Sequence, residues 1–109
     1  MENFDEYQRL ARRTLNQNVE DSMRFANLGM GLAGESGEVC DYLKKVVFHG
    51  HSLDADKLKD ELGDVLWYLA NLADTTGLSL SEVAEHNIEK LRQRYPDGFA
   101  ADKSRYRQR

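Results

Sequence analysis

The sequence has few of the features that mark secreted and membrane proteins, such as paired cysteines and long apolar runs. Its single cysteine, Cys40, cannot form an internal disulfide, and we expect it to pack as a small apolar group. No apolar run is long enough to span a membrane. Residues 1–6 carry neither the basic nor the apolar region of a signal peptide. These absences predict a cytoplasmic protein without a membrane partner.

Basic residues are too few for an ordinary nucleic-acid-binding domain. The formal net charge is −4 and the pI is about 5.3, whereas such domains are strongly basic. Residues 88–109 nevertheless hold seven Lys or Arg against three acids. This end of the chain can therefore meet phosphates, while the acidic remainder attracts cations. A nucleic-acid surface on the basic end is the competing interpretation, which the acidic total disfavours.

No segment shows the alternation of apolar and polar residues that is typical of a strand. The single proline leaves long segments free to be helical. Amphipathic patterns predict helices over about residues 4–18, 23–48, 53–75 and 79–94. Ser79 and Glu82 match a capping box at the start of the last helix. The apolar residues of this helix are expected to point inward, namely Leu80, Val83, Ala84, Ile88 and Leu91. A chain of 109 residues can build one modest core. We therefore predict an all-α fold, with one helical domain over residues 1–99 and a basic tail over residues 100–109.

Two pairs of acids in the middle of the chain have the same spacing. Glu35 and Glu38 lie on the second predicted helix, and Glu61 and Asp64 lie on the third. Residues three apart share a helix face, and each pair adjoins the apolar stripe of its own helix. The stripes are Leu32, Val39, Leu43 and Val46 on the second helix, and Leu58, Leu62, Val65, Leu69 and Leu72 on the third. If the two stripes pack antiparallel, as the short connection favours, all four carboxylates can converge at the edge of the core.

Carboxylates that converge partly out of water repel each other, so such a cluster requires a cation. Oxygen ligands alone favour Mg²⁺ or Mn²⁺ over zinc. Gly37 and Gly63 lie inside the acidic segments and would let a ligand or a neighbouring backbone come close. The alternative is that both pairs are ordinary acids on a solvated helix face, which is common in a chain with 19 Asp and Glu.

The third predicted helix is apolar over most of its circumference. Trp67 lies roughly opposite its stripe, and Leu66 and Ala70 fill part of the gap between them. A helix buried on both sides, in a chain this small, predicts a partner subunit. The alternative is that Trp67 packs under the first or the fourth helix of its own chain.

Longer motifs resemble one protein family. In order along the chain they are residues 31–39 (GLAGESGEV), residues 60–69 (DELGDVLWYL), Asn87-x-x-Lys90 and residues 94–99 (RYPDGF). Together they resemble the MazG-like all-α nucleoside triphosphate pyrophosphohydrolases, over about residues 23–99. The ordered set of motifs is far more specific than either acid pair alone.

The resemblance implies a four-helix fold that forms homodimers or dimers of dimers, with sites near the interface. It implies hydrolysis of a (deoxy)nucleoside triphosphate to the monophosphate and pyrophosphate. In this family pattern, Mg²⁺, or else Mn²⁺, would be held by Glu35, Glu38, Glu61 and Asp64. The resemblance further implies that the substrate phosphates contact Asn87 and Lys90.

One position departs from the family pattern. Many members open the first motif with two adjacent acids, and this chain has Gly34 in the first of those places. Glu35 or Glu38 would then have to activate the attacking water as well as bind metal, with Asp41 as a more distant substitute. A second class of function stays open, namely a noncatalytic helical interaction module whose acids form a structural or incidental cluster.

Overall fold

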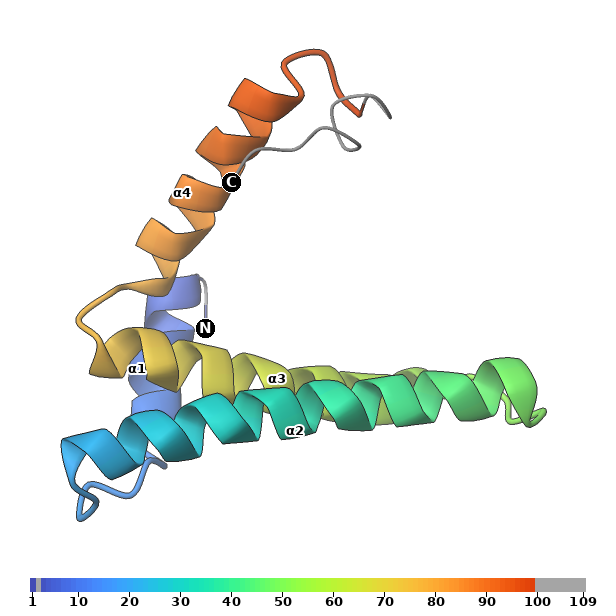
Figure 1. Ribbon diagram of the computed structural model, residues 1–109, viewed down its shortest axis with the longest axis horizontal. Helices are drawn as coiled ribbons and strands as arrows, with labels where there is room; N and C mark the ends of the chain where they lie inside the picture. The colour runs from blue at the N-terminus through green and yellow to red at the C-terminus, as the bar shows by residue number, and fades with distance from the viewer. Residues whose placement is uncertain (2, 100–109) are drawn as a thin grey trace.

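A computed structural model describes residue 1 and residues 3–99 of the chain (Figure 1). In this part the chain forms the helices α1 (Phe4–Arg12), α2 (Asp21–Phe48), α3 (Ala55–Thr75) and α4 (Leu80–Arg94). No strand occurs among the described residues, so the all-α prediction is confirmed. None of these four helices is long and apolar enough to cross a membrane. The predicted tail over residues 100–109 lies outside the described residues.

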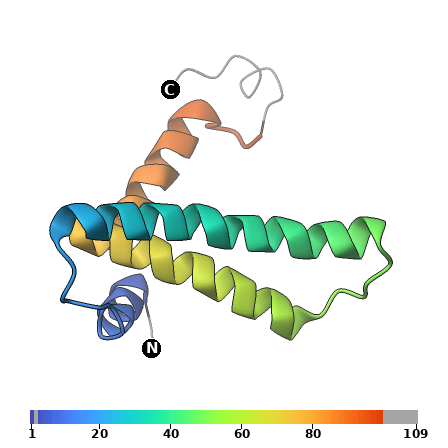
Figure 2. The ribbon, with the colours of Figure 1, turned by 60° about the horizontal axis from the view of Figure 1, so that its bottom comes forward.

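The two longest helices, α2 and α3, run antiparallel side by side (Figure 2). Tyr42 ties down the connection between them, because its hydroxyl accepts a hydrogen bond from the Asp54 N–H at 2.7 Å. The Asp54 side chain in turn accepts hydrogen bonds from the N–H groups of Asp56 and Lys57. Such a cap satisfies N–H groups that have no partner within the helix. It therefore fixes where α3 begins.

Helix α1 packs against α3 and α4, and α3 lies between α1 and α2 (Figure 2). Gln8 is only 4% exposed, and its side chain makes the central contacts. Its Nε2 donates hydrogen bonds to the carbonyls of Ala70 and Leu78, and its Oε1 accepts one from the Leu80 N–H. One buried side chain thus joins α1 to the turn between α3 and α4.

Helix α1 ends at Arg12, whereas the sequence predicted a helix through residue 18. The N–H groups of residues 13–15 bond to carbonyls three positions earlier, which is the tighter pattern of a 3₁₀ turn. Beyond it, the Asn16 side chain accepts a hydrogen bond from the Asn18 N–H. Local bonds of this kind compete with the helix. Apolar spacing does not reveal this stop, because the spacing continues past it.

Helix α4 begins at the predicted capping box. The Ser79 hydroxyl accepts a hydrogen bond from the Glu82 N–H at 3.0 Å, and the Glu82 carboxylate accepts one from the Ser79 N–H at 3.4 Å. The helix then projects away from the pair formed by α2 and α3 (Figure 1). As a result, Ile88 and Leu91, which were expected to point inward, are 46% and 38% exposed.

The apolar core of the described chain is small. Its buried members are Ala11, Leu28, Tyr42, Ala70, Ala73 and Leu80. The predicted stripes of α2 and α3 are only partly covered, since Leu43, Leu62 and Leu69 are 40%, 49% and 37% exposed. Cys40 is exposed as well, so the expectation that it packs as an apolar group is wrong. One chain alone therefore leaves apolar side chains of all these helices in water.

One glycine allows α2 and α3 to come into close contact. A Cβ at Gly31 would overlap the ring of Tyr68, so a residue without a side chain is needed at this position. A Cβ at Gly37 or Gly63 would meet nothing within 4 Å. Close approach of a ligand or a second backbone at those two positions stays a prediction.

Trp67 packs within its own chain. Its ring lies edge-to-face on Tyr68, with the ring centroids 4.9 Å apart. Its Nε1–H donates a hydrogen bond to the Thr14 hydroxyl at 2.7 Å, just beyond the end of α1. The structure thus places Trp67 beside the first helix, which was the alternative to a subunit interface.

Candidate metal centre

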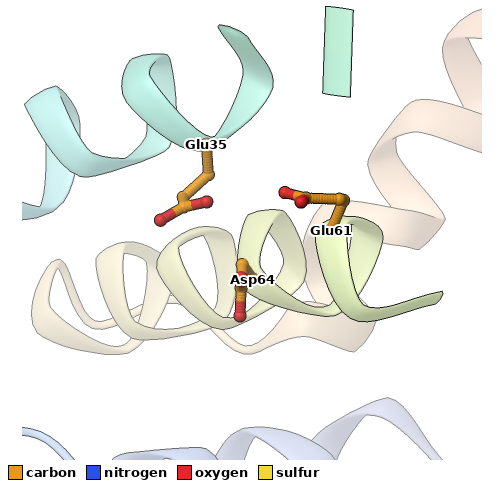
Figure 3. Close-up of side chains that lie close together, drawn as sticks. All are labelled: Glu35, Glu61 and Asp64. Atoms are coloured by element: carbon orange, nitrogen blue, oxygen red, sulfur yellow. The ribbon is translucent and has the colours of Figure 1, made fainter. Parts of the chain in front are cut away.

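Three carboxylates from two helices come close together where α2 packs on α3. Figure 3 shows Glu35 and Glu61 between the two ribbons, and Asp64 pointing to the side of α3 away from α2. Glu35 reaches across from α2, whereas Glu61 and Asp64 belong to α3. One oxygen of each side chain lies within 4.8 Å of the other two. Glu35 and Glu61 are half-buried and Asp64 is exposed. The cluster therefore lies at the edge of the helix pair, where a ligand can reach it from solvent.

Helix periodicity explains why these three residues meet. Glu61 and Asp64 are three positions apart, so they share one face of α3. Glu35 lies between Leu32 and Val39, two half-buried residues of the α2 stripe. The antiparallel packing of the two helices then brings Glu35 over the acidic face of α3. The same apolar contacts that pair the helices thus position the carboxylates.

Charge repulsion acts on Glu35 in particular. Partial removal from water raises the pKa of the Glu35 carboxyl, and the charges of Asp64, Glu61 and Glu38 raise this pKa further. Lys57 offsets part of the negative charge, because its Nζ lies 3.6 Å from a Glu61 oxygen. A divalent cation held among the three carboxylates would relieve the repulsion directly.

The donor set fits a hard divalent cation. All three potential ligands are carboxylate oxygens, and no His or Cys belongs to this group. Carboxylates suit Mg²⁺ and Mn²⁺, whereas zinc sites are built mainly from His and Cys. Three oxygens also leave open positions for water or phosphate oxygens in the octahedral shell that Mg²⁺ demands.

The fourth predicted acid, Glu38, is not one of the three that the structure brings together. It is exposed on α2, although its charge contributes to the raised pKa of Glu35. Asp41, the suggested substitute base, lies 3.1 Å from the Lys45 Nζ and 3.8 Å from the Lys44 Nζ. The hydrogen bond and the charge of Lys45 lower the pKa of Asp41. A carboxylate with a lowered pKa is a poor proton acceptor, so Asp41 is a weak candidate base.

The predicted phosphate contacts lie on α4, outside the carboxylate group. Asn87 is exposed and Lys90 is half-buried. Helix α4 projects from the pair that carries the acids (Figure 1). The structure does not add these two side chains to the cluster, and their role stays a prediction.

Two neighbours of the cluster were missed from the sequence. Burial raises the pKa of the Tyr7 hydroxyl, and the charge of Asp64 raises this pKa further, so the charge of the acids acts on a side chain of α1. In the sequence Tyr7 belongs to an apolar helix face, which carries no sign of such a neighbour. Lys57 did leave a signal, since it precedes Glu61 by four residues, the spacing of a helical ion pair.

Comparison with known proteins agrees with the motifs and the helical fold. Residues 24–99 match the family model of the MazG nucleotide pyrophosphohydrolase domain, which is more than half of the chain. Gene 37 protein of Mycobacterium phage L5 is 40% identical over 73 residues, which are 63% of this chain and 64% of that protein. The chain thus spans a little under two thirds of this relative, whose name states no activity. No solved structure matches the chain.

Proposed function

The chain belongs to the MazG nucleotide pyrophosphohydrolase family, and from this premise we propose that it is a Mg²⁺-dependent hydrolase of (deoxy)nucleoside triphosphates. The products would be the nucleoside monophosphate and pyrophosphate. The observation that carries the proposal is the group of carboxylates from Glu35, Glu61 and Asp64, whose oxygens lie within 4.8 Å of one another. Nothing else in the described helices concentrates so many potential oxygen ligands in one place.

In this proposal the three clustered carboxylates bind and orient the metal, and Glu38 joins them or acts beside them. Mg²⁺, or Mn²⁺ in its place, would supply positive charge for the triphosphate, which an acidic surface otherwise repels. Asn87 and Lys90 would contact the phosphates, where a lysine offsets the charge that develops on the leaving pyrophosphate. Because Asn87 and Lys90 lie on α4, which projects away from the acids, this helix has to approach the substrate.

The reaction breaks the phosphoanhydride bond between the α- and β-phosphates. One water supplies a hydroxyl to one side of the broken bond and a proton to the surroundings. Glu38 is our preferred acceptor of this proton, because it lies near Glu35 yet outside the group of three. Glu35 is the other candidate, because partial removal from water and the charges of its neighbours raise its pKa.

We also propose that the active unit is a homo-oligomer, at least a dimer. The support is the apolar surface that one chain leaves uncovered on its helices. Met30, Val47 and Phe48 on α2 are 74%, 69% and 77% exposed, and α4 exposes Ile88 and Leu91. A second copy that covered such surface would also limit the motion of the helices that carry the acids.

Pyrophosphate release from a panel of nucleoside triphosphates tests the activity. We expect release with Mg²⁺ and none after chelation. Asp64→Asn and Glu38→Gln should lose the activity and keep the helical content, whereas Glu20→Gln, an exposed acid at the start of α2, serves as the control. A folded protein that releases no pyrophosphate from any nucleotide would favour the noncatalytic interaction module.

A further inference from the structure

Lys57 places a positive charge at the edge of the three clustered carboxylates. Its Nζ lies 3.6 Å from a Glu61 oxygen and 5.3 Å from the centre of the Tyr42 ring. The Lys57 side chain is 53% exposed, whereas that of Glu61 is 17% exposed. The ammonium therefore meets the site from its solvent side. Neither Lys57 nor Tyr42 belongs to the motifs that resemble the family.

The start of α3 is an unfavourable place for a lysine. The helix begins at Ala55, so Lys57 lies in its first turn, where the free N–H groups favour acids over cations. A lysine that precedes a glutamate by four residues is also the weaker order for an ion pair on a helix. Local helix chemistry thus does not account for Lys57, and the contacts of its ammonium have to be considered.

The ring of Tyr42 gives this ammonium a second partner. Tyr42 is 5% exposed, and its hydroxyl accepts a hydrogen bond from the Asp54 N–H at 2.7 Å. The ring is therefore fixed relative to the start of α3. An ammonium within about 6 Å of the centre of an aromatic ring is attracted to the ring face. Glu61 and Tyr42 thus share one ammonium, and loss of one partner leaves the other.

A metal ion would compete with Lys57 for the charge of Glu61. Without a metal, the ammonium reduces the repulsion among Glu35, Glu61 and Asp64, whose oxygens lie within 4.8 Å of one another. A divalent cation on the same carboxylates repels the ammonium. The Tyr42 ring, which carries no net charge, is then the partner that remains.

We propose that Lys57 is a positioning residue of the metal centre, which pairs with Glu61 until a divalent cation binds and is then held by the Tyr42 ring. The inference rests on the proposed metal site and adds a residue that does not ligate the metal. The ammonium keeps Glu61 beside its acidic neighbours before the metal arrives. A lysine in this role stabilises the metal-free protein and lowers its affinity for the metal.

Calorimetric titration of the whole chain with Mg²⁺ alone tests this role. Lys57→Met removes the charge and keeps a long side chain. Ion pairs near a surface change equilibria by up to about fivefold, so the variant should bind Mg²⁺ about two- to fivefold more tightly. Lys59→Met is the matched control, because the Lys59 Nζ lies 3.5 Å from an Asp56 oxygen and its side chain is 77% exposed. Equal affinities in wild type and Lys57→Met would overturn the proposal.

The melting temperature separates this role from a purely structural one. Metal-free Lys57→Met should melt at a lower temperature than metal-free wild type, because the repulsion among the acids is no longer reduced. Mg²⁺ should then raise the melting temperature of the variant by more than that of wild type. A lysine that only supports the fold would lower both melting temperatures equally, and this result would also overturn the proposal.

Two variants of Tyr42 test the second partner. Both Tyr42→Phe and Tyr42→Leu lose the hydroxyl, and only Tyr42→Leu loses the ring. Tyr42→Leu should bind Mg²⁺ more weakly than Tyr42→Phe, because the displaced ammonium has no ring to receive it. Combination with Lys57→Met should abolish this difference. A difference that persists without the lysine would show that the ring acts through packing alone, and would reject its part in the proposal.

Failure of this inference is separable from failure of the proposed hydrolysis. Tighter Mg²⁺ binding by Lys57→Met, in a protein that releases no pyrophosphate, would keep the role of Lys57 and reject the hydrolase. Mg²⁺-dependent hydrolysis with equal Mg²⁺ affinities in wild type and variant would keep the hydrolase and reject the role of Lys57. A wild-type protein that binds no Mg²⁺ would reject both.

Discussion

At the scale of single residues, Glu35 is placed by the fold where its ionised form is unfavourable, although a metal ligand has to be ionised. The packing of α2 on α3 brings this carboxyl to two others, and its pKa is raised by partial burial and by the charges of Asp64, Glu61 and Glu38. The folded protein therefore favours the protonated form more than the unfolded chain does. An ionised carboxylate in such a position is stable only if a bound cation compensates for the repulsion from its neighbours.

The first prediction concerns the pH dependence of stability without metal. Because the Glu35 pKa is higher in the folded state than in the unfolded state, its contribution is most favourable below the unfolded value. That contribution is lost as the pH rises through the raised value. Urea unfolding in the presence of a chelator should show this loss, and Glu35→Gln should remove it. Glu20→Gln should retain the wild-type dependence, and identical curves for wild type and Glu35→Gln would contradict the assignment.

The second prediction concerns the metal itself. A cation that binds only the folded protein raises the free energy of unfolding by about 2.7 kcal/mol at a concentration 100 times its Kd. We expect Mg²⁺ and Mn²⁺ to raise the melting temperature of the wild-type protein, and Asp64→Asn to reduce the increase. Differential scanning calorimetry with and without a chelator measures both effects. An equal increase in the variant would place the metal elsewhere.

At the scale of helices, the third prediction concerns the contact of Gly31 with Tyr68. Replacing a helical glycine by alanine normally stabilises a helix by up to about 1 kcal/mol. Gly31→Ala should instead destabilise by about 1–3 kcal/mol, because the new methyl group would overlap the Tyr68 ring. Gly29→Ala, where nothing lies within 4 Å of the added Cβ, is the control and should be stabilising. Urea unfolding compares them, and equal effects would mean that the helices do not touch here.

The fourth prediction concerns the attachment of α1. Gln8→Leu removes the side-chain partner of the buried Leu80 N–H and both bonds to the carbonyls of Ala70 and Leu78. Leaving a buried polar group unpaired costs about 1–3 kcal/mol, so thermal unfolding should occur at a lower temperature. Gln93→Leu, which loses an exposed bond to Glu89, should change stability little. A small effect at Gln8 would show that α1 is held by its apolar contacts instead.

Much at this scale was predictable from the sequence. The capping box at Ser79 fixes the start of α4 by local chemistry. The other helices were predicted from apolar stripes that are separated by turn residues. The early end of α1 was not predictable, because it depends on hydrogen bonds that override an apolar spacing. The meeting of Glu35 with Glu61 and Asp64 followed from their place beside the stripes. The neighbouring Tyr7 comes from a helix distant in sequence, and spacing says nothing about such contacts.

At the scale of the whole molecule, the direction of α4 is the feature that the sequence left open. Periodicity shows which face of a helix is apolar and leaves unknown which surface covers it. The apolar face of α4 was assigned to the chain's own core, yet Ile88 and Leu91 are 46% and 38% exposed. Trp67 shows the converse, since a side chain expected at an interface donates a hydrogen bond to Thr14 of its own chain. Substituting Trp67 would therefore disturb α1 and could not isolate an interface.

The fifth prediction is that a second copy covers the exposed apolar surface, including that of α4. Fully burying one large apolar side chain contributes about 1.5–3 kcal/mol, so several half-exposed ones can together favour association. Ile88→Asp places a charge in that surface and should give smaller particles by light scattering, with lower hydrolytic activity at the same protein concentration. Glu85→Gln, an exposed neighbour on the same helix, should leave the particle size unchanged. A wild-type protein that is monomeric at micromolar concentration and fully active would show that the four helices of one chain suffice.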